Sequence, residues 1–95
     1  MPKGYWIANN IVHDLEGYKA YQRANAVPFE KYGARFLVRG GRFEAPEGTA
    51  RDRNVVVQFA DYETARACYA SPEYAAARQI RMANAEADFL IVEGT

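Results

Sequence analysis

Residues 36–44, FLVRGGRFE, begin as a β-strand and end in two glycines flanked by arginines. The aromatic and β-branched residues at the start favour a strand, whereas the glycine pair interrupts one. We therefore predict a strand over residues 34–41, followed by a turn-rich segment over residues 44–52. Glycines let another group approach the backbone closely. That group is either a ligand or a partner subunit crossing the end of a twisted strand.

The segments on either side of this strand alternate between strand and helix. Asp14, Asp61 and Ser71 are suitable helix N-caps, and Gly33 is a natural helix end. Pro28 has no N–H to donate, so we expect a kink in the first helix. The predicted strands are residues 5–12, 34–41, 54–59 and 87–93, and the predicted helices are residues 14–32, 61–69 and 71–84.

This β-α-β-β-α-β order, with the second helical segment broken at Ser71, predicts an α+β ferredoxin-like fold. The sheet would be four-stranded and antiparallel, with the helices on one face. A chain of 95 residues fits a single domain over residues 1–95.

Composition narrows the classes of partner. Lys+Arg and Asp+Glu both number 12, so the net charge is zero, which argues against nucleic-acid binding and against attraction to an anionic membrane. Cys68 is the single cysteine and cannot form an internal disulfide. No apolar run reaches transmembrane length, and the N-terminus lacks a signal-peptide pattern. The cytoplasm is therefore the expected location.

Alternation along the strands predicts that both faces of the sheet are apolar. The helix-facing set is expected to be Tyr5, Ile7, Asn9, Ile11, Phe36, Val38, Val55, Val57, Phe59, Phe89 and Ile91. The opposite set is expected to be Trp6, Ala8, Asn10, Val12, Leu37, Arg39, Val56, Gln58, Leu90 and Val92. This second set is too apolar for a solvent-exposed face.

A homodimer in which two sheets meet face to face would cover that second set and close a barrel. Asn10, Arg39 and Gln58 would then project into a mostly apolar interior, as in a small-molecule site. Alternatively, these polar groups satisfy one another across the dimer. A single β-bulge would exchange the two faces.

The chain resembles the domain of unknown function 1330 family in five segments: GYWIA (4–8), YGARFLVRGG (32–41), NVVVQF (54–59), SPEYAAAR (71–78) and ADFLIVEG (87–94). The resemblance implies a dimeric α+β barrel, a fold shared with small monooxygenases of antibiotic biosynthesis and muconolactone isomerase-like proteins. It implies no activity. Family members often begin the first helix with Asp-Pro-Glu, and Leu15 replaces that proline here.

Two residues are candidates for catalysis. Arg39, with the N–H of Gly40, is suited to hold a carboxylate or enolate oxygen. His13 is the only histidine and the readiest general base near neutral pH, although a lone surface histidine in a loop is the simpler interpretation.

Further residues are candidates for lining a ligand site. Asn25 lies among aromatic residues, either as a structural bridge or as a donor to a ligand. Tyr69 and Tyr74 flank the helix break and would line a cavity mouth. The predicted ligand-binding residues are therefore Asn10, Asn25, Arg39, Gly40, Gln58, Tyr69 and Tyr74. Ser71 is interpreted as a cap and Cys68 as a buried apolar residue.

The sequence contains no metal-ligand spacing, P-loop or dinucleotide-binding motif, so we predict no metal or cofactor. We predict a cytoplasmic homodimer that binds a small, partly apolar organic molecule. If it is catalytic, cofactor-independent isomerase, lyase or monooxygenase-type chemistry is expected. The alternative is a non-catalytic binding or structural dimer.

Overall fold

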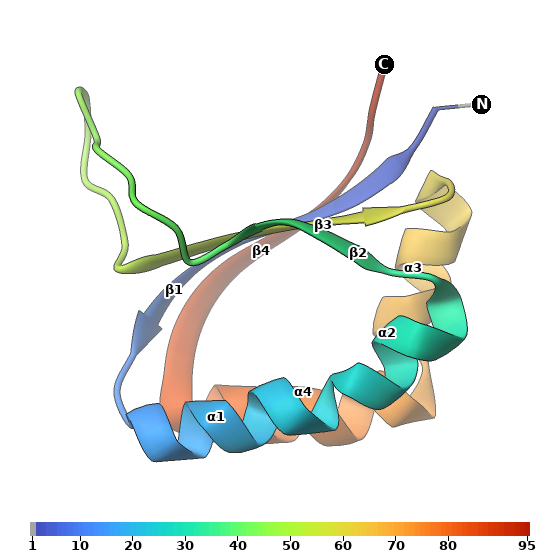
Figure 1. Ribbon diagram of the computed structural model, residues 1–95, viewed down its shortest axis with the longest axis horizontal. Coiled ribbons are helices and arrows are strands. Elements are labelled where there is room, and N and C mark those ends of the chain that lie inside the picture. Colours follow the sequence, from blue (N-terminus) through green and yellow to red (C-terminus); the bar gives the residue numbers. More distant parts are fainter. Residues whose placement is uncertain (1) are drawn as a thin grey trace.

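The computed structural model describes residues 2–95 and has the predicted α+β ferredoxin-like fold. The sheet has the strand order β2-β3-β1-β4, every pairing is antiparallel, and the helices cover one face (Figure 1). The elements in chain order are β1 (Gly4–Val12), α1 (Leu15–Ala24), α2 (Ala26–Tyr32), β2 (Arg35–Arg39), β3 (Arg53–Phe59), α3 (Tyr62–Ala70), α4 (Pro72–Asn84) and β4 (Ala85–Glu93).

Side-chain caps start three of the helices, as the sequence predicts. The Asp14 carboxylate accepts a hydrogen bond from the Gly17 N–H at 3.2 Å at the start of α1. Asp61 accepts from the Thr64 N–H at 2.7 Å before α3. The Ser71 hydroxyl accepts from the Tyr74 N–H at 3.1 Å before α4.

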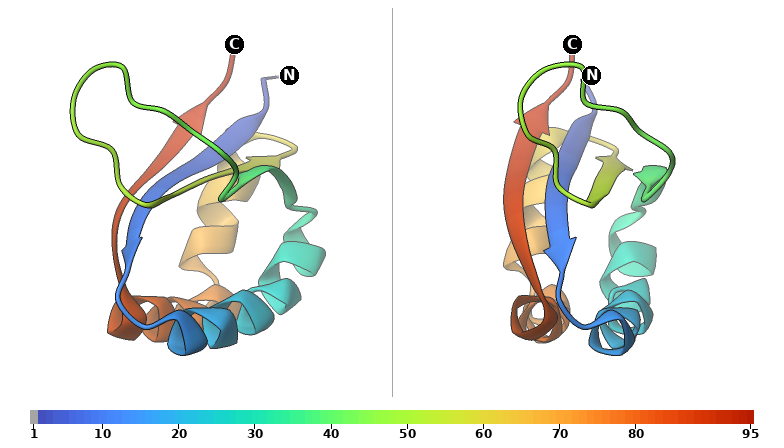
Figure 2. Two further views of the ribbon diagram at one scale, coloured as in Figure 1. Left: turned by 60° about the vertical axis from the view of Figure 1, so that its left-hand side comes forward. Right: turned by 90° about the vertical axis from the view of Figure 1, so that its left-hand side faces the viewer.

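The predicted first helix is two consecutive helices, because the helix is interrupted at Asn25, which lies between α1 and α2. Pro28 has no N–H, so it cannot donate the helical hydrogen bond to the Ala24 carbonyl. Ala24 is the last residue of α1. The predicted kink is therefore a change of helix axis (Figure 2). α2 ends at Gly33, which has the left-handed φ of 68°.

The predicted facing of the first strand is wrong. Trp6, Ala8 and Asn10 are buried on the helix side, and Val12 packs against the same core. The register places Trp6 opposite Val57 and Ile91, which do face the helices as predicted. Tyr5, Ile7, Asn9 and Ile11 therefore face away from the helices. Both sets of β1 residues are largely apolar, so alternation alone did not orient the strand.

A β-bulge between Phe36 and Val38 changes the facing of β2. Phe36 pairs with Val57 on the helix side, as predicted. After the bulge, Val38 pairs with Val56 on the opposite face, and Arg39 pairs with Val55. Val38 and Arg39 have thus exchanged their predicted sides of the sheet.

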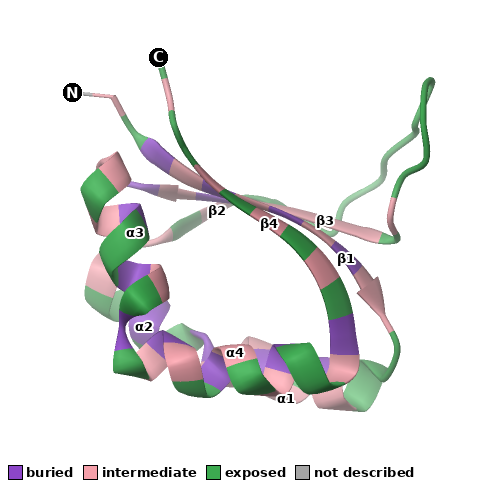
Figure 3. Cartoon of the chain, turned by 180° about the vertical axis from the view of Figure 1, so that it is seen from behind, coloured by how far each residue is buried: buried purple, intermediate pink, exposed green. Residues whose placement is uncertain are grey.

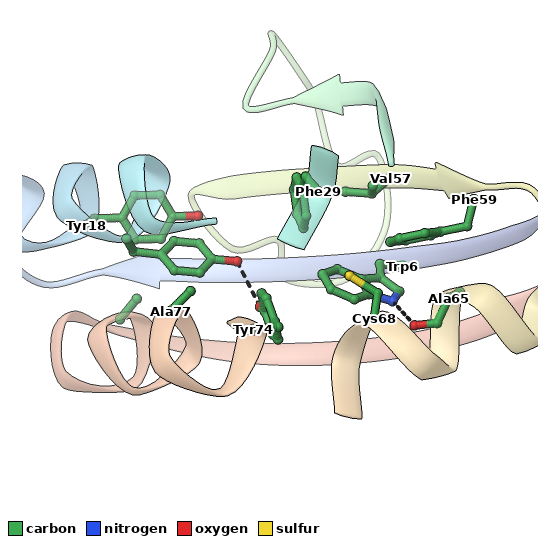
Figure 4. Packing of buried hydrophobic residues seen from close by; sticks show 11 residues of the cluster. Trp6, Tyr18, Phe29, Val57, Phe59, Ala65, Cys68, Tyr74 and Ala77 are labelled. Atoms are coloured by element: carbon green, nitrogen blue, oxygen red, sulfur yellow. Dashed lines mark hydrogen bonds between the residues drawn. The ribbon is translucent and has the colours of Figure 1, made fainter. Parts of the chain in front are cut away.

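Trp6 lies at the centre of the core (Figure 4). Its ring packs against Phe29, Phe59 and Tyr74 at centroid distances of 5.4, 4.9 and 4.7 Å. The indole N–H donates to the Ala65 carbonyl at 2.9 Å, so the buried donor is satisfied. Because Trp6 is 1% exposed, burial of this ring is a main contribution to stability.

The sheet face away from the helices is apolar, as predicted, but with different β1 residues. We call it the outer face. Its apolar residues are Tyr5, Ile7, Ile11, Val38, Val56, Leu90 and Val92, and its polar residues are Asn9, Arg35, Asn54, Gln58, Glu86 and Asp88. Burial alternates along β4, and its outward residues are exposed (Figure 3). Leu90 is 59% exposed, so this face carries apolar surface in contact with solvent.

Residues 40–50 between β2 and β3 are all exposed and stand away from the sheet and helices (Figure 2). Within residues 2–95, no helix has both the length and the apolar composition needed to cross a membrane.

Candidate ligand-binding site

A pocket opens between the helix-facing side of the sheet and helices α1, α2 and α4. Its apolar wall is formed by aromatic and aliphatic side chains from both layers. Polar side chains reach it from β1, α1, the α1–α2 break, β2, β3 and α4. The lining residues are Trp6, Ala8, Asn10, Tyr18, Tyr21, Gln22, Asn25, Phe29, Phe36, Arg39, Arg53, Val55, Val57, Arg81 and Phe89.

The pocket is narrow. The space between its walls that holds no protein atom is about 430 Å³, including the open mouth. The cavity left between the side chains is about 20 Å³, which suffices for about one water. An organic ligand therefore enters only if a lining side chain moves.

Two asparagines place polar groups in this pocket. Asn10 is 1% exposed, and its side-chain N–H₂ donates to the Arg53 carbonyl at 3.4 Å. Its Oδ1 is buried without a hydrogen-bond partner among residues 2–95. Asn25, which is also buried, lies at the break between α1 and α2. An unpaired buried acceptor is costly, so Asn10 Oδ1 requires an explanation.

Three arginines line the pocket, and each lies against an aromatic ring. The guanidinium carbons of Arg39, Arg53 and Arg81 are 4.2, 5.3 and 5.3 Å from the centroids of the Phe36, Tyr18 and Phe89 rings. Within the described chain, none of the three forms a salt bridge, and no Asp or Glu is among the lining residues. The pocket is therefore positively charged although the whole chain is neutral.

Arg81 is the most deeply buried of these arginines. It is 4% exposed, and its Nε has no hydrogen-bond partner within residues 2–95. Burial disfavours its charged form, but the nearby oxygens of Tyr74 and Tyr21 outweigh that effect and raise the pKa of Arg81. The guanidinium therefore stays charged in an apolar environment, where charges are normally paired.

Two tyrosine hydroxyls meet beside the pocket. The oxygens of Tyr21 and Tyr74 are 2.8 Å apart, and both side chains are buried. Tyr74 is labelled in Figure 4, where a dashed line marks this hydrogen bond. Burial, followed by the neighbouring Tyr74, raises the pKa of Tyr21, and burial also raises the pKa of Tyr74. Both phenols are protonated at neutral pH, so this pair donates hydrogen bonds and does not act as a base.

The structure brings together only part of the predicted site. Asn10, Asn25 and Arg39 line the pocket. Tyr74 bonds to the lining residue Tyr21. Tyr69 packs behind the lining, 5.9 Å from Trp6 and 5.1 Å from Phe89. The ligand-binding roles of these residues stay predictions.

Gln58 and His13 lie elsewhere. Gln58 pairs with Tyr5 on the outer face. The prediction that Gln58 lies on the same face as Asn10 and Arg39 is therefore wrong. The His13 ring lies in the exposed β1–α1 connection, where Nε2 is 2.7 Å from Glu86 Oε2. His13 is not a lining residue, and its catalytic role stays a prediction without geometric support.

Gly40 shapes the site indirectly. Its φ is 68°, a left-handed conformation that glycine adopts without strain. A Cβ at this position would collide with the guanidinium of Arg53. Gly40 therefore leaves room for Arg53 to reach the pocket beside Asn10, its partner in the β1–β3 register.

Arg53, Arg81 and Tyr21 are lining residues that the sequence analysis did not select. Arg81 follows the buried Tyr74 and Ala77 at helical spacing, so an arginine on the buried side of a helix was a readable signal. Arg53 had no such signal, because its position depends on the strand register. Ser71 and Cys68 have the predicted structural roles, as a cap and as a buried thiol. Among residues 2–95, no cluster of three or more His, Cys, Asp and Glu side chains could hold a metal ion.

The fold described above is that of a small α+β protein with a four-stranded antiparallel sheet, and comparisons identify its family. The model of the family described as "Domain of unknown function (DUF1330)" matches residues 3–95, so the chain belongs to that family. This agrees with the resemblance in the sequence. A search of the curated proteins finds no match.

Solved structures with low sequence identity share the fold. A protein of unknown function from Rhodopseudomonas palustris is 15% identical, with a TM-score of 0.80 over 99% of this chain and 83% of that one. SnoaB, a cofactor-independent oxygenase from Streptomyces nogalater, is 13% identical, with a TM-score of 0.67 over 100% and 95%. A dimeric ferredoxin-like protein of unknown function from Thermobifida fusca is 16% identical, with a TM-score of 0.60 over 96% and 92%.

Proposed function

We propose that the protein binds a small, partly apolar organic molecule in the pocket between sheet and helices. One observation carries this proposal. Asn10 and Arg81 are almost fully buried, each has an unpartnered polar atom, and both line a pocket whose walls are otherwise largely apolar. Buried polar groups normally have partners, so a ligand is the natural candidate for the missing ones.

Entry of such a molecule requires the pocket to widen. Arg39 is the exposed arginine of the three and lies on β2, an edge strand of the sheet. We propose that Arg39 swings off the Phe36 ring to admit the ligand and then contacts it. Asn10 and Asn25 would supply further hydrogen bonds.

The narrowness of the pocket favours a second candidate, a non-catalytic structural dimer. In that case the space holds about one water, which hydrogen-bonds to Asn10 Oδ1 and fills the site. The two candidates differ in the effect of removing the polarity of Asn10, as described below.

If the protein is an enzyme, its lining restricts the chemistry. The titratable groups among the described lining residues are Tyr18, Tyr21 and the three arginines, and none is a carboxylate or histidine. The raised pKa of Tyr21 keeps its hydroxyl protonated near neutral pH, so it can donate a hydrogen bond to a developing anion but is a poor general acid or base. These groups stabilise developing negative charge, which suits cofactor-independent isomerase, lyase or monooxygenase-type reactions of an enolisable substrate. The cofactor-independent activity given for SnoaB supports only the plausibility of such chemistry on this fold.

The apolar outer face supports assembly as a homodimer. Ile7, Val56 and Leu90 are neighbours in the register and form the middle of this face. Pairing two such faces would remove the exposed apolar surface from water. The Thermobifida fusca protein is described as dimeric, in agreement with this arrangement. We place the dimer in the cytoplasm, as the sequence predicts.

The test combines native mass spectrometry with a titration. Mass spectrometry of the purified protein detects a retained small molecule. Trp6 is the single tryptophan and lines the pocket, so its fluorescence reports occupancy by one-ring aromatic probes such as benzoate and benzamide. The informative variant is Asn10→Leu, which removes the polar group at similar volume, and the control is Gln58→Leu on the outer face.

Ligand binding predicts that Asn10→Leu weakens probe affinity roughly three- to tenfold without reducing stability, because an unpaired buried acceptor is removed. A structural role predicts that neither the wild type nor Asn10→Leu binds the probes, and that Asn10→Leu loses stability. If Gln58→Leu alone abolishes binding, the molecule sits between the two sheets of the dimer and the assignment to this pocket fails.

A further inference from the structure

We infer that the ligand of this pocket is an organic anion that also carries a hydrogen-bond donor, and that Arg81 is the residue that binds its negative charge. This inference rests on the proposed function and adds the chemical class of the ligand. It also moves the charge contact from the exposed Arg39, which the sequence suggested, to the buried Arg81.

The described lining residues of the pocket carry positive charge only. Arg39, Arg53 and Arg81 supply three positive charges, and the described lining residues contain no carboxylate. Every salt bridge within residues 2–95 involves other basic residues. A neutral ligand would leave this charge uncompensated, whereas a carboxylate or enolate would compensate part of it.

Burial selects Arg81 among the three. Arg39 is exposed and Arg53 is half-buried, so water screens the charge of each more than that of Arg81. The Nε atoms of Arg53 and Arg81 both lack a hydrogen-bond partner within residues 2–95, but only Arg81 is buried as a whole side chain, at 4% exposed. A charge in such an environment attracts a counter-ion more strongly than the same charge at the surface does.

The tyrosine pair adds a second donor near Arg81. The two hydroxyl oxygens are 2.8 Å apart, so one hydroxyl donates its proton to the other oxygen. The proton of the accepting hydroxyl is then free to form another hydrogen bond. When Tyr74 donates to Tyr21, the free proton belongs to Tyr21, which lines the pocket beside Arg81. Arg81 and Tyr21 together then form a pair of donors for one anionic oxygen.

Asn10 contributes an acceptor to the pocket, whereas Arg81 and Tyr21 contribute donors. Its Oδ1 accepts hydrogen bonds only, and it has no partner within the described chain. A ligand that satisfies it needs an O–H or N–H group. A ligand that satisfies the lining therefore has an anionic oxygen and a separate donor, joined by an apolar body that contacts the aromatic wall of Trp6, Phe29 and Phe89 once a lining side chain has moved.

Four probes test this class in the 95-residue chain at neutral pH by Trp6 fluorescence: benzoate, benzamide, 4-hydroxybenzoate and 4-hydroxybenzamide. Arg81→Met removes the buried charge while keeping the apolar stem. Arg78→Met, three residues earlier on α4 and outside the lining, is the matched control. Thermal unfolding of each variant confirms that it is folded.

We expect each acid to bind about tenfold or more tightly than its amide, and we expect Arg81→Met to remove this preference while Arg78→Met keeps it. The hydroxyl group should strengthen binding several-fold in the wild type and not in Asn10→Leu. The preference for acid should persist in about 0.5 M salt, because a buried pair is weakly screened.

Equal affinity for acid and amide would overturn the inference while leaving the proposed small-molecule site intact. A preference that survives in Arg81→Met, or that disappears in salt, would assign the charge contact to the exposed arginines and also overturn it. Absence of binding by all four probes, with no retained molecule in native mass spectrometry, would defeat the proposed function as well.

Discussion

The hydroxyl oxygens of Tyr21 on α1 and Tyr74 on α4 lie 2.8 Å apart in the interior and join the two helices that pack beneath the sheet. Neither ring has access to water that would stabilise a phenolate. The pair is therefore neutral in the folded protein, and its raised pKa values connect the packing of α1 on α4 to the stability of the fold at alkaline pH.

This pair predicts alkaline destabilisation. In the unfolded chain both tyrosines ionise near pH 10, whereas in the folded protein they keep their protons to higher pH. Their contribution is fully present below about pH 10 and is lost as the pH rises beyond it, by up to about 1.4 kcal/mol per pH unit for each tyrosine. Urea unfolding between pH 7 and 11 measures this loss. The double variant Tyr21→Phe/Tyr74→Phe should show a shallower decline than the control Tyr62→Phe, and an identical decline would contradict the prediction.

The thiol of Cys68 should be chemically inert in the folded protein. Cys68 is fully buried, and burial raises its pKa to about 12. The thiolate is the reactive species, so a disulfide reagent at pH 8 should label native protein only through opening of the fold. Labelling should become fast in denaturing urea. Rapid stoichiometric labelling without denaturant would show that this part of the core is open to solvent.

Three glycine variants separate the two constraints on Gly40. Gly40→Ala should lose about 1–3 kcal/mol of unfolding free energy, because φ is 68° and the new methyl group meets Arg53. Gly33→Ala has the same φ with open space around it, so it should lose less. Gly41→Ala has neither constraint and should lie within about 0.5 kcal/mol of wild type. Equal stability of all three in denaturant titrations would remove the argument for Gly40.

The outer face should control oligomerisation. Leu90→Asp places a charge in the middle of that face and should convert the homodimer into a monomer at micromolar concentration. Leu15→Asp is the control, because Leu15 is 60% exposed on a helix, compared with 59% for Leu90. Sedimentation velocity distinguishes the outcomes. A wild-type protein that sediments as a single chain would refute the dimer.

The position of Trp6 is testable by fluorescence alone. Because the indole is buried in the core and bonded to Ala65, its emission should be blue-shifted and resistant to acrylamide in monomer and dimer alike. The measurement is quenching in the wild type and in Leu90→Asp. If quenching rises sharply only when the dimer dissociates, Trp6 lies on the outer face, which is the side that alternation along the strand predicts for it.

The fold was largely predictable because its signals are local. The caps Asp14, Asp61 and Ser71 and the breakers Pro28 and Gly33 act over a few residues, and they mark the element ends within a few positions. The facing of β1 was not predictable in this way. Trp6 and Ile7 are both apolar, so only the pairing of Trp6 with Val57 orients the strand.

The candidate site was predictable only in part for the same reason. Asn10, Asn25 and Arg39 stand out as polar residues in apolar surroundings, and they do line the pocket. Arg53 joins them through long-range register. Gln58 was grouped with Arg39 because the bulge in β2 is invisible in the sequence, and that bulge carries the two residues to opposite faces.

The bulge has a consequence for how ligand preference diversifies on this scaffold. It decides which of two adjacent side chains, Val38 or Arg39, is presented at the pocket mouth. Loss or gain of one residue in β2 would exchange a cation for an aliphatic group there without altering any residue type. An insertion or deletion in this edge strand can therefore change ligand selectivity during evolution. A residue-by-residue comparison of the aligned side chains would not reveal that change.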